Sequence, residues 1–92
     1  MSVYCYVLNK KDNVCIALKD LKPEEIIQVG TVKIKILEEI PFGFKVSLTN
    51  IPMGTAIIKD GYPIGTATKD IPAGALVHIH NVKSSRSKEW GV

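Results

Sequence analysis

The chain has 92 residues, enough for one small domain, and its 46% apolar and 23% charged residues are ordinary for a globular protein. Its formal net charge of +3 comes from basic and acidic residues that alternate along the whole sequence, which argues against a basic stripe for nucleic acid. No apolar run reaches membrane-spanning length and the first residues lack the basic region of a signal peptide, so we expect no membrane span and a cytoplasmic protein.

The first strand pair is predicted from residues 3–8 and 14–18, which are rich in strand-forming residues and flank a polar turn. Each predicted strand contains one cysteine, Cys5 or Cys15. The sequence has no CxxC motif and no cluster of cysteine with histidine, so we interpret both as reduced thiols that pack as small buried groups. A disulfide bond across the hairpin is the alternative.

Residues 31–37 alternate polar and apolar side chains, which indicates a strand with one buried face. We expect Val32, Ile34 and Ile36 to point inward. Lys33 and Lys35 should then lie in water, as should the two glutamates that follow this strand.

A short turn motif recurs at residues 50–54 (NIPMG) and 70–74 (DIPAG), and a degenerate copy lies at residues 20–24 (DLKPE). In each copy the first side chain can cap backbone N–H groups two or three residues ahead, as at a helix N-cap. Proline suits a first turn and glycine ends it, so we predict a single 3₁₀ turn that leads into a strand. Glu24 stands where glycine is expected, which predicts a different shape for that copy.

Between the two complete copies, Asp60 and Gly61 are flanked by apolar residues, which is a strong signal for a two-residue hairpin turn. Pro63 cannot donate a hydrogen bond to a neighbouring strand. It therefore belongs at a sheet edge or at a place where strand pairing is interrupted.

No segment has a helical period of more than two turns, so we predict an all-β domain of short strands in a clipped or barrel-like sheet. The domain is expected to span residues 1–83. Residues 84–92 are polar and are expected to form a flexible tail, in which the lone Trp90 either docks on a partner or is disordered.

His78 and His80 are two residues apart in a predicted strand, so their rings should project from one face about 6.5–7 Å apart. Val77 and Ile79 should then face the core. Two imidazoles at this spacing can share a metal or contact an anion, or they are simply solvated. No third cysteine or histidine accompanies them, so we expect no metal site within the chain, and Asn81 can bond a substrate or hold a turn.

Three further side chains are candidates for ligand binding. Lys45 follows a glycine and carries a charge suited to a carboxylate, although an isolated surface lysine is the simpler interpretation. Lys59 and Tyr62 flank the predicted hairpin turn, where the tyrosine can pack instead.

Several motifs occur in a specific order: residues 43–46 (GFKV), 59–67 (KDGYPIGTA), 70–74 (DIPAG) and 77–81 (VHIHN). In this order they resemble the amino-terminal SAF-type domain of altronate dehydratase, and the resemblance covers residues 12–83. Galactarate dehydratase and the small subunit of sulfolactate sulfo-lyase are similar. Phe44 departs from the usual GHK and Asp60 from the usual KYG, so any action of the family's histidine or tyrosine on substrate is absent here or supplied elsewhere.

The resemblance implies a β-clip fold and a small subunit, or a detached amino-terminal module, of a hydro-lyase that removes water from a sugar acid. It implies a large catalytic subunit that carries most of the catalysis and a divalent metal such as iron, while this chain caps the active site. The substrate-binding residues that it implies are His78, His80, Asn81, Lys45, Lys59 and Tyr62.

Two other interpretations remain open. The chain can be a non-catalytic module that binds a sugar acid or a protein, which the absence of the GHK histidine favours. It can also be an assembly domain that forms a homodimer through its β-rich edges. Sulfolactate desulfonation is a substrate variant of the hydro-lyase interpretation.

Overall fold

The computed structural model describes residues 5–6 and 10–84, and all regular secondary structure in this part of the chain is β-strand. This confirms the predicted all-β fold, and no helix in the described residues is long and apolar enough to cross a membrane. The described strands are β1 (Cys5–Tyr6), β2 (Val14–Ala17), β3 (Ile26–Val29), β4 (Val32–Lys35), β5 (Lys45–Ser47), β6 (Ala56–Lys59), β7 (Tyr62–Ala67), β8 (Leu76–Val77) and β9 (Val82–Ser84). Ser84 thus ends a strand instead of beginning the predicted tail, whereas Trp90 lies outside the described residues.

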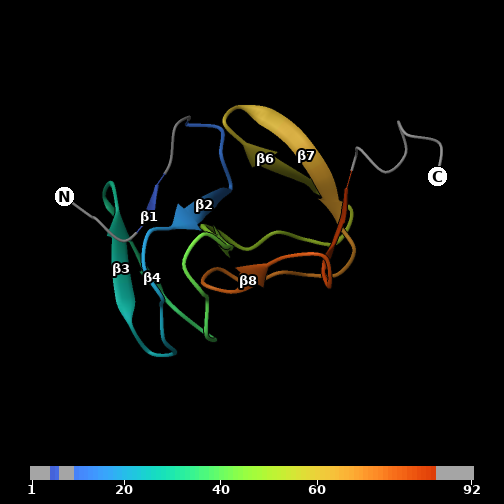
Figure 1. The fold of residues 1–92 in the computed structure, drawn as a ribbon. Coiled ribbons are helices and arrows are strands. Elements are labelled where there is room, and N and C mark those ends of the chain that lie inside the picture. Colours follow the sequence, from blue (N-terminus) through green and yellow to red (C-terminus); the bar gives the residue numbers. More distant parts are fainter. Residues whose placement is uncertain (1–4, 7–9, 85–92) are drawn as a thin grey trace.

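The strands form three antiparallel groups (Figure 1). One sheet has the strand order β1-β2-β5-β8, a second has the order β6-β7-β9, and β3 pairs with β4 as a hairpin. In Figure 1 the β3–β4 hairpin and the β6–β7 hairpin lie on opposite sides of the central strands β2 and β8. The chain therefore presents two hairpins around one central sheet.

Two clusters of buried apolar side chains form the core. The first cluster contains Cys5, Cys15, Ala17, Leu21, Ile27, Ile34, Ile36, Ile40 and Val46. The second contains Val14, Ile51, Ile57, Ala67, Ile71, Ala75 and Val77. Full burial of an isoleucine side chain stabilises the fold by about 1.5–3 kcal/mol. Isoleucines of the turn motif belong to both clusters, so the repeated turns are part of the core.

The alternation predicted for residues 31–37 is confirmed for Ile34 and Ile36, which are buried, and for the exposed Lys33 and Lys35. The prediction is wrong for Val32, whose side chain is 52% exposed. Val32 pairs with Val29 at the tip of the β3–β4 hairpin, beyond the pair that enters the core. Alternation predicts which face a residue occupies, but it does not predict how far along the strand the core extends.

The turn motif has a fourth copy, at residues 40–43 (IPFG), which was not among the predicted copies. Each copy closes a β-turn by a backbone hydrogen bond, for example from Thr55 N to Pro52 O at 3.0 Å and from Ala75 N to Pro72 O at 3.2 Å. The third residue of these turns has a φ between 76° and 90°, while the second has no positive φ, which defines type II turns. The predicted 3₁₀ turn is therefore wrong, because the left-handed residue lies within the turn and not after it.

The degenerate copy adopts the same turn without glycine. Glu24 has a φ of 76°, so the predicted difference in shape is wrong. A left-handed conformation costs a non-glycine residue about 1–2 kcal/mol. The next residue supports this turn, because the Glu25 carboxylate accepts a hydrogen bond from Lys22 N at 2.8 Å and pairs with Lys19 at 2.9 Å. These contacts, the backbone bond foremost, lower the pKa of Glu25 below its usual value.

The four turns are arranged as two antiparallel pairs. Ile51 and Ile71 exchange two backbone hydrogen bonds, with N–O distances of 2.7 and 2.8 Å. Leu21 and Ile40 do the same at 2.8 and 2.9 Å. Turns that are distant in sequence therefore contact each other through the apolar residue that directly precedes each turn.

In three of the four copies, the polar residue at the start of the motif caps the partner turn and not its own. Asp70 Oδ1 accepts a hydrogen bond from Met53 N at 2.8 Å, and Asn50 Oδ1 accepts one from Ala73 N at 3.0 Å. Asp20 accepts a bond in the same way across the other pair, at 2.8 Å. The predicted cap within one turn is wrong, because antiparallel pairing directs each side chain toward the N–H groups of its partner.

Replacing Asp70 with alanine should lower the free energy of unfolding by about 0.5–2 kcal/mol, because the cap of the partner turn is lost. Asp70→Asn keeps an oxygen acceptor and should lose clearly less. Urea denaturation measures both effects, with Lys69→Ala at the neighbouring exposed position as the control. Equal losses for Asp70→Ala and Lys69→Ala would contradict the capping role.

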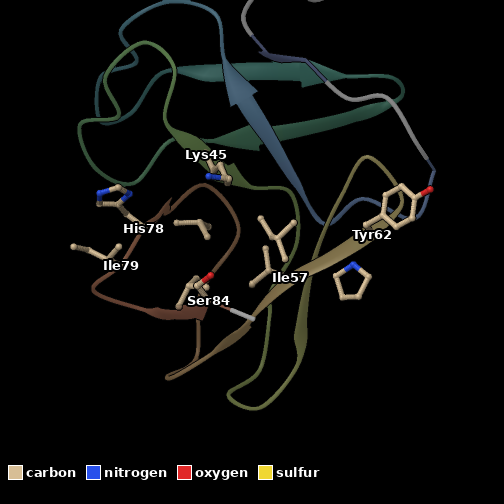
Figure 2. A pocket seen from close by; sticks show the side chains of 10 residues that line it. Lys45, Ile57, Tyr62, His78, Ile79 and Ser84 are labelled. Carbon is tan, nitrogen blue, oxygen red and sulfur yellow. The ribbon is translucent and has the colours of Figure 1, made fainter. Parts of the chain in front are cut away.

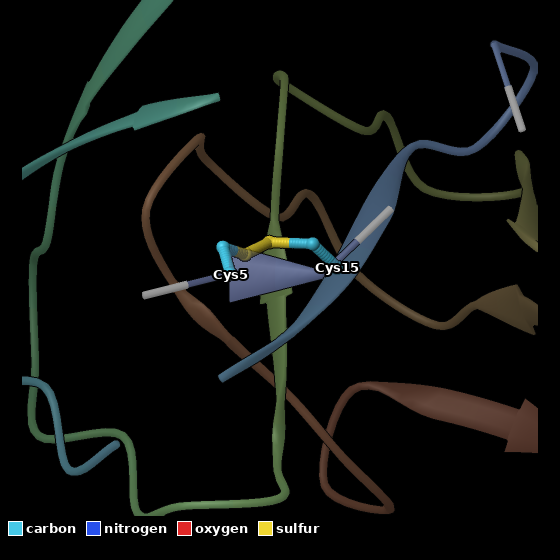
Figure 3. Close-up of a disulfide and its surroundings, with 2 residues drawn as sticks. All are labelled: Cys5 and Cys15. Atoms are coloured by element: carbon cyan, nitrogen blue, oxygen red, sulfur yellow. A yellow bond between two sulfur atoms is a disulfide. The ribbon is translucent and has the colours of Figure 1, made fainter. Parts of the chain in front are cut away.

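Cys5 and Cys15 form a disulfide bond that joins β1 to β2 (Figure 3). Their Cα atoms are 5.8 Å apart, within the usual range for this bond. The prediction of reduced thiols is therefore wrong, although both side chains are buried as predicted. Motif spacing does not show which residues face each other across a hairpin, and so it could not decide between thiols and a disulfide.

A cross-link between residues ten positions apart restricts the unfolded chain and should stabilise the fold by about 2–3 kcal/mol. Adding a dithiol reductant should therefore lower the melting temperature by about 10–20 °C. Circular dichroism melting curves with and without the reductant measure the change. The double variant Cys5→Ser/Cys15→Ser should melt at the lower temperature in both conditions, and a reductant-dependent shift in this variant would contradict the explanation.

Candidate functional site

The β6–β7 hairpin forms one wall of the pocket that contains the candidate site. Asp60 and Gly61 have φ values of 55° and 83°, which confirms the predicted two-residue turn. Pro63 faces Ile58 next to a register shift in the β6–β7 ladder, and the pairing of β7 with β9 begins only at Gly65. Pro63 therefore lies where pairing is interrupted, as predicted, and both Pro63 and Ile64 line the pocket described below.

A pocket of about 600 Å³ opens between this hairpin, β5, β8 and β9, and its volume is within the range of small-molecule sites (Figure 2). Its lining is mostly apolar. The residues that line it are Lys45, Ile57, Tyr62, Pro63, Ile64, Val77, His78, Ile79, Val82 and Ser84. Of the side chains predicted from sequence, the pocket thus brings together Lys45, His78 and Tyr62.

The pairing of β5 with β8 places Lys45 and His78 at the same end of the pocket. Lys45 faces Val77 in this ladder, and the next residues along, Phe44 and His78, are in ring contact with centroids 4.9 Å apart and planes tilted by 55°. Lys45 is half-buried, and no carboxylate of the described residues lies within 4.0 Å of its ammonium group. An ammonium and an imidazole at one end of a pocket can together bind a carboxylate.

The predicted strand at residues 77–81 ends early, because β8 stops at Val77 and the chain turns. The turn is closed by a hydrogen bond from the backbone N–H of residue 81 to His78 O at 3.0 Å. Ile79 is 83% exposed at the pocket rim, so the prediction that it faces the core is wrong. His80 is exposed and does not line the pocket, so the two imidazoles do not share one strand face.

Asn81 holds this turn through its side chain. Its Oδ1 accepts a hydrogen bond from His78 N at 2.9 Å, and its Nδ2 donates one to Leu76 O at 2.8 Å. The side chain is buried, with 5% exposed. Of the two roles weighed for Asn81, the geometry supports the turn role, and the signal for it in the sequence is the preference of asparagine for such turns.

The two other predicted binding residues, Lys59 and Tyr62, lie apart from the end of the pocket that Lys45 and His78 line. The Lys59 ammonium pairs with Asp60 at 2.9 Å on the hairpin turn, and Lys59 does not line the pocket. Tyr62 lines the pocket at the side opposite His78 and is 73% exposed (Figure 2). The pocket therefore separates a polar end near Lys45 from an aromatic rim.

Sequence reasoning missed the apolar walls and Ser84. Ser84 reaches the pocket because β9 pairs with β7, where it faces Gly65. A Cβ atom on Gly65 would lie 2.6 Å from Lys83 O and 2.7 Å from the Val82 side chain, so only glycine permits this close approach. Glycine within a strand often marks close contact with another backbone. Gly65 was therefore the sequence signal that a further strand, β9, lies close to β7 at this position.

No group of three or more histidine, cysteine, aspartate or glutamate side chains in residues 5–6 and 10–84 is arranged to hold a metal ion. The described part of the pocket offers one imidazole, one ammonium, a tyrosine and a serine hydroxyl. These groups can pair with an anion and bond to hydroxyls. The metal of the predicted large subunit stays a prediction.

The sequence of this chain is similar to that of known lyases. The family described as the altronate/galactarate dehydratase SAF domain matches residues 4–85. Altronate dehydratase of Bacillus subtilis is 38% identical over 80 residues, which cover 87% of this chain and 16% of that protein. Altronate dehydratase of Escherichia coli is 40% identical over 76 residues, which cover 83% of this chain and 15% of that protein.

A shorter relative is also similar. The (2R)-sulfolactate sulfo-lyase subunit alpha of Chromohalobacter salexigens is 32% identical over 59 residues, which cover 64% of this chain and 63% of that subunit. The chain thus spans about one-sixth of the altronate dehydratases that it matches and a larger share of the sulfo-lyase subunit. With the match over residues 4–85, the chain belongs to the family of altronate/galactarate dehydratase SAF domains.

Proposed function

We propose that this chain forms the substrate-facing cap of a hydro-lyase that removes water from a sugar acid, with most of the catalysis on a larger dehydratase polypeptide. The observation that carries the proposal is the polar end of the pocket, which Lys45 and His78 both line because β5 pairs with β8. The relatives support it, because their names describe altronate dehydratases and a lyase subunit.

Lys45 and His78 would act on the acid group and on hydroxyls. The Lys45 ammonium would pair with the substrate carboxylate, and burial in a partly apolar pocket would strengthen this charge-assisted bond. His78 would bond the same carboxylate or a neighbouring hydroxyl, held in place by the Asn81 turn and by ring contact with Phe44. Together they would orient the sugar acid toward the catalytic polypeptide.

Dehydration also needs a base for the proton beside the carboxylate, and an acid or a metal ion for the departing hydroxide. We place both on the larger polypeptide, where a divalent metal such as iron would supply the Lewis acid. In this chain, binding and orientation are the contributions that the described residues support.

Phe44 favours a second candidate function, a binding module without a direct part in the chemistry. Phe44 occupies the position of the histidine in the family's GHK motif, and its ring contacts His78. A phenyl ring cannot act as a general acid or base. The mostly apolar lining of the pocket also fits a binding role. The two candidates differ in whether the chain changes the turnover of a catalytic partner.

Adding this chain to a homologous dehydratase polypeptide that lacks its SAF domain tests the proposal, with hexonates such as altronate and galactarate as substrates. The chain should raise the rate of water loss, and Phe44→His should raise it further if the usual histidine of the family acts on substrate. Phe44→Tyr, which keeps the ring, is the matched control. Hexonate binding measured by calorimetry, without any gain in turnover from either protein, would favour the binding module.

A further inference from the structure

We infer that Glu38 is a positioning residue for the polar end of the pocket: its carboxylate holds β8 in place and, through β8, the imidazole of His78. Glu38 was not among the residues predicted to act at the site, and it does not line the pocket. The effect of Glu38 on the geometry of His78 does not depend on the hydro-lyase role, whereas its effect on a sugar acid rests on the proposed function.

The strand β8 lies at the edge of its sheet and consists of two residues, Leu76 and Val77. β5 pairs with one side of β8, and no strand in residues 5–6 and 10–84 pairs with the other side. An open strand edge presents backbone N–H and C=O groups that need partners from water or from other parts of the chain. The position of so short a strand therefore depends on the groups that bond to its open side.

Two side chains bond to the open side of β8, in place of a neighbouring strand. The Glu38 carboxylate accepts a hydrogen bond from Leu76 N at 3.0 Å, and the Asn81 side chain donates one to Leu76 O at 2.8 Å. A hydrogen bond to an ionised acceptor is about twice as strong as one between neutral groups. Glu38 is therefore well suited to fix this strand, and it does so from 38 positions earlier in the chain.

The segment that carries Glu38 is itself bonded to the turn before β8. Leu37 N donates a hydrogen bond to Gly74 O at 3.0 Å, so the Glu38 side chain extends from a backbone that is already held beside this turn. The neighbouring Glu39 has a different partner, because its carboxylate pairs with Lys22 at 3.1 Å. Of the two adjacent glutamates, Glu38 is thus the one that bonds to β8.

Two further contacts connect this bond to His78. Asn81, which bonds to Leu76 O, also accepts a hydrogen bond from His78 N at 2.9 Å. The His78 imidazole in turn contacts the Phe44 ring, with centroids 4.9 Å apart. A shift of Leu76 would therefore disturb both the turn that holds His78 and the ring contact that orients its imidazole.

The imidazole protons of His78 report on this geometry, because the nearby Phe44 ring shifts their NMR signals. In Glu38→Ala these signals should move toward those of the exposed His80, and the Leu76 amide should exchange with solvent about ten times faster. The variant His80→Ala identifies the signals of His78, since the chain has two histidines. Unchanged His78 signals in folded Glu38→Ala would overturn the inference.

Two variants separate the hydrogen bond from a general effect of charge. Glu38→Gln removes the charge but keeps an oxygen acceptor, so it should retain most of the His78 shift. Glu39→Ala makes the same change as Glu38→Ala at the next position and should leave the His78 signals as they are. If either variant behaves like Glu38→Ala, the hydrogen bond to β8 is not the cause. Circular dichroism checks that each variant is folded, and Glu38→Asp, which withdraws the acceptor by one methylene, replaces Glu38→Ala if that variant does not fold.

Hexonate turnover separates this inference from the proposed function. If both are correct, Glu38→Ala should raise the KM for altronate severalfold with the catalytic polypeptide and leave kcat within about twofold, because it weakens binding and not the chemical step. His78 signals that respond to Glu38 as expected, in a chain that binds no hexonate, would support the positioning role and count against the sugar-acid site. Unchanged His78 signals in folded Glu38→Ala, with normal hexonate binding, would count against the positioning role alone.

Discussion

Replacing Gly74 with alanine is expected to be among the most destabilising single changes in this domain, with a loss of about 3–5 kcal/mol in the free energy of unfolding. Two effects add. Gly74 has a φ of 89°, which strains any other residue, and a Cβ atom there would lie 1.9 Å from Lys35 O. The paired turn packs directly on the end of β4, where Leu37 N donates a hydrogen bond to Gly74 O at 3.0 Å.

Gly54 in the partner turn is a matched control, because its φ is 90° but a Cβ atom there would meet nothing within 4 Å. Gly54→Ala should therefore lose only the conformational part, about 1–2 kcal/mol. Thermal melting should show a drop of about 15 °C or more for Gly74→Ala and a clearly smaller one for Gly54→Ala. Similar melting temperatures for the two variants would show that the contact between this turn and β4 does not contribute.

Replacing Lys45 or His78 with alanine should weaken hexonate binding about ten- to a hundredfold. Each change removes a bond to the substrate carboxylate, and a charged hydrogen bond contributes about 1.5–3 kcal/mol. Calorimetry on the full chain, or turnover with the catalytic polypeptide, measures the loss. This prediction rests on the proposed function.

His80→Ala is the control for His78→Ala, because it makes the same chemical change two residues away. His80 does not line the pocket, so its loss should change affinity less than twofold. Circular dichroism should show that all three variants remain folded. Equal losses for His78→Ala and His80→Ala would argue against the pocket as the sugar-acid site and for a ligand bound on the outer face of the turn.

Much of the local structure could be predicted from the sequence. Asp60 and Gly61 specify the β6–β7 turn, because a two-residue hairpin needs positive φ at both positions. The alternation around Ile34 specifies the buried face of β4. The repeated turn motif was visible as well, although its turn type was mistaken, since a glycine two residues after proline can end a 3₁₀ turn or occupy the left-handed position of a type II turn.

Parts of the site could also be predicted, but not its composition. Lys45, His78 and Tyr62 were found as candidates from charge and motif order, and all three line the pocket. His80 was grouped with them because a strand was assumed to continue, and Asn81 because it belongs to the motif VHIHN. The strand ends because the Asn81 side chain bonds back to the backbone of Leu76 and His78 across a turn, and residue spacing does not show such bonds.

What the sequence by itself determined are features set by a few neighbouring residues: strand alternation, hairpin turns, and the positions where a left-handed backbone is needed. Tertiary structure alone decided the pairing of the four turns, the disulfide between β1 and β2, and the pocket between β5, β7 and β9. The physical reason is that these contacts join residues far apart in sequence, whose meeting depends on strand register and on the packing of the whole core. Lys45 and His78 are 33 positions apart in the chain and line one pocket because β5 pairs with β8 in one register.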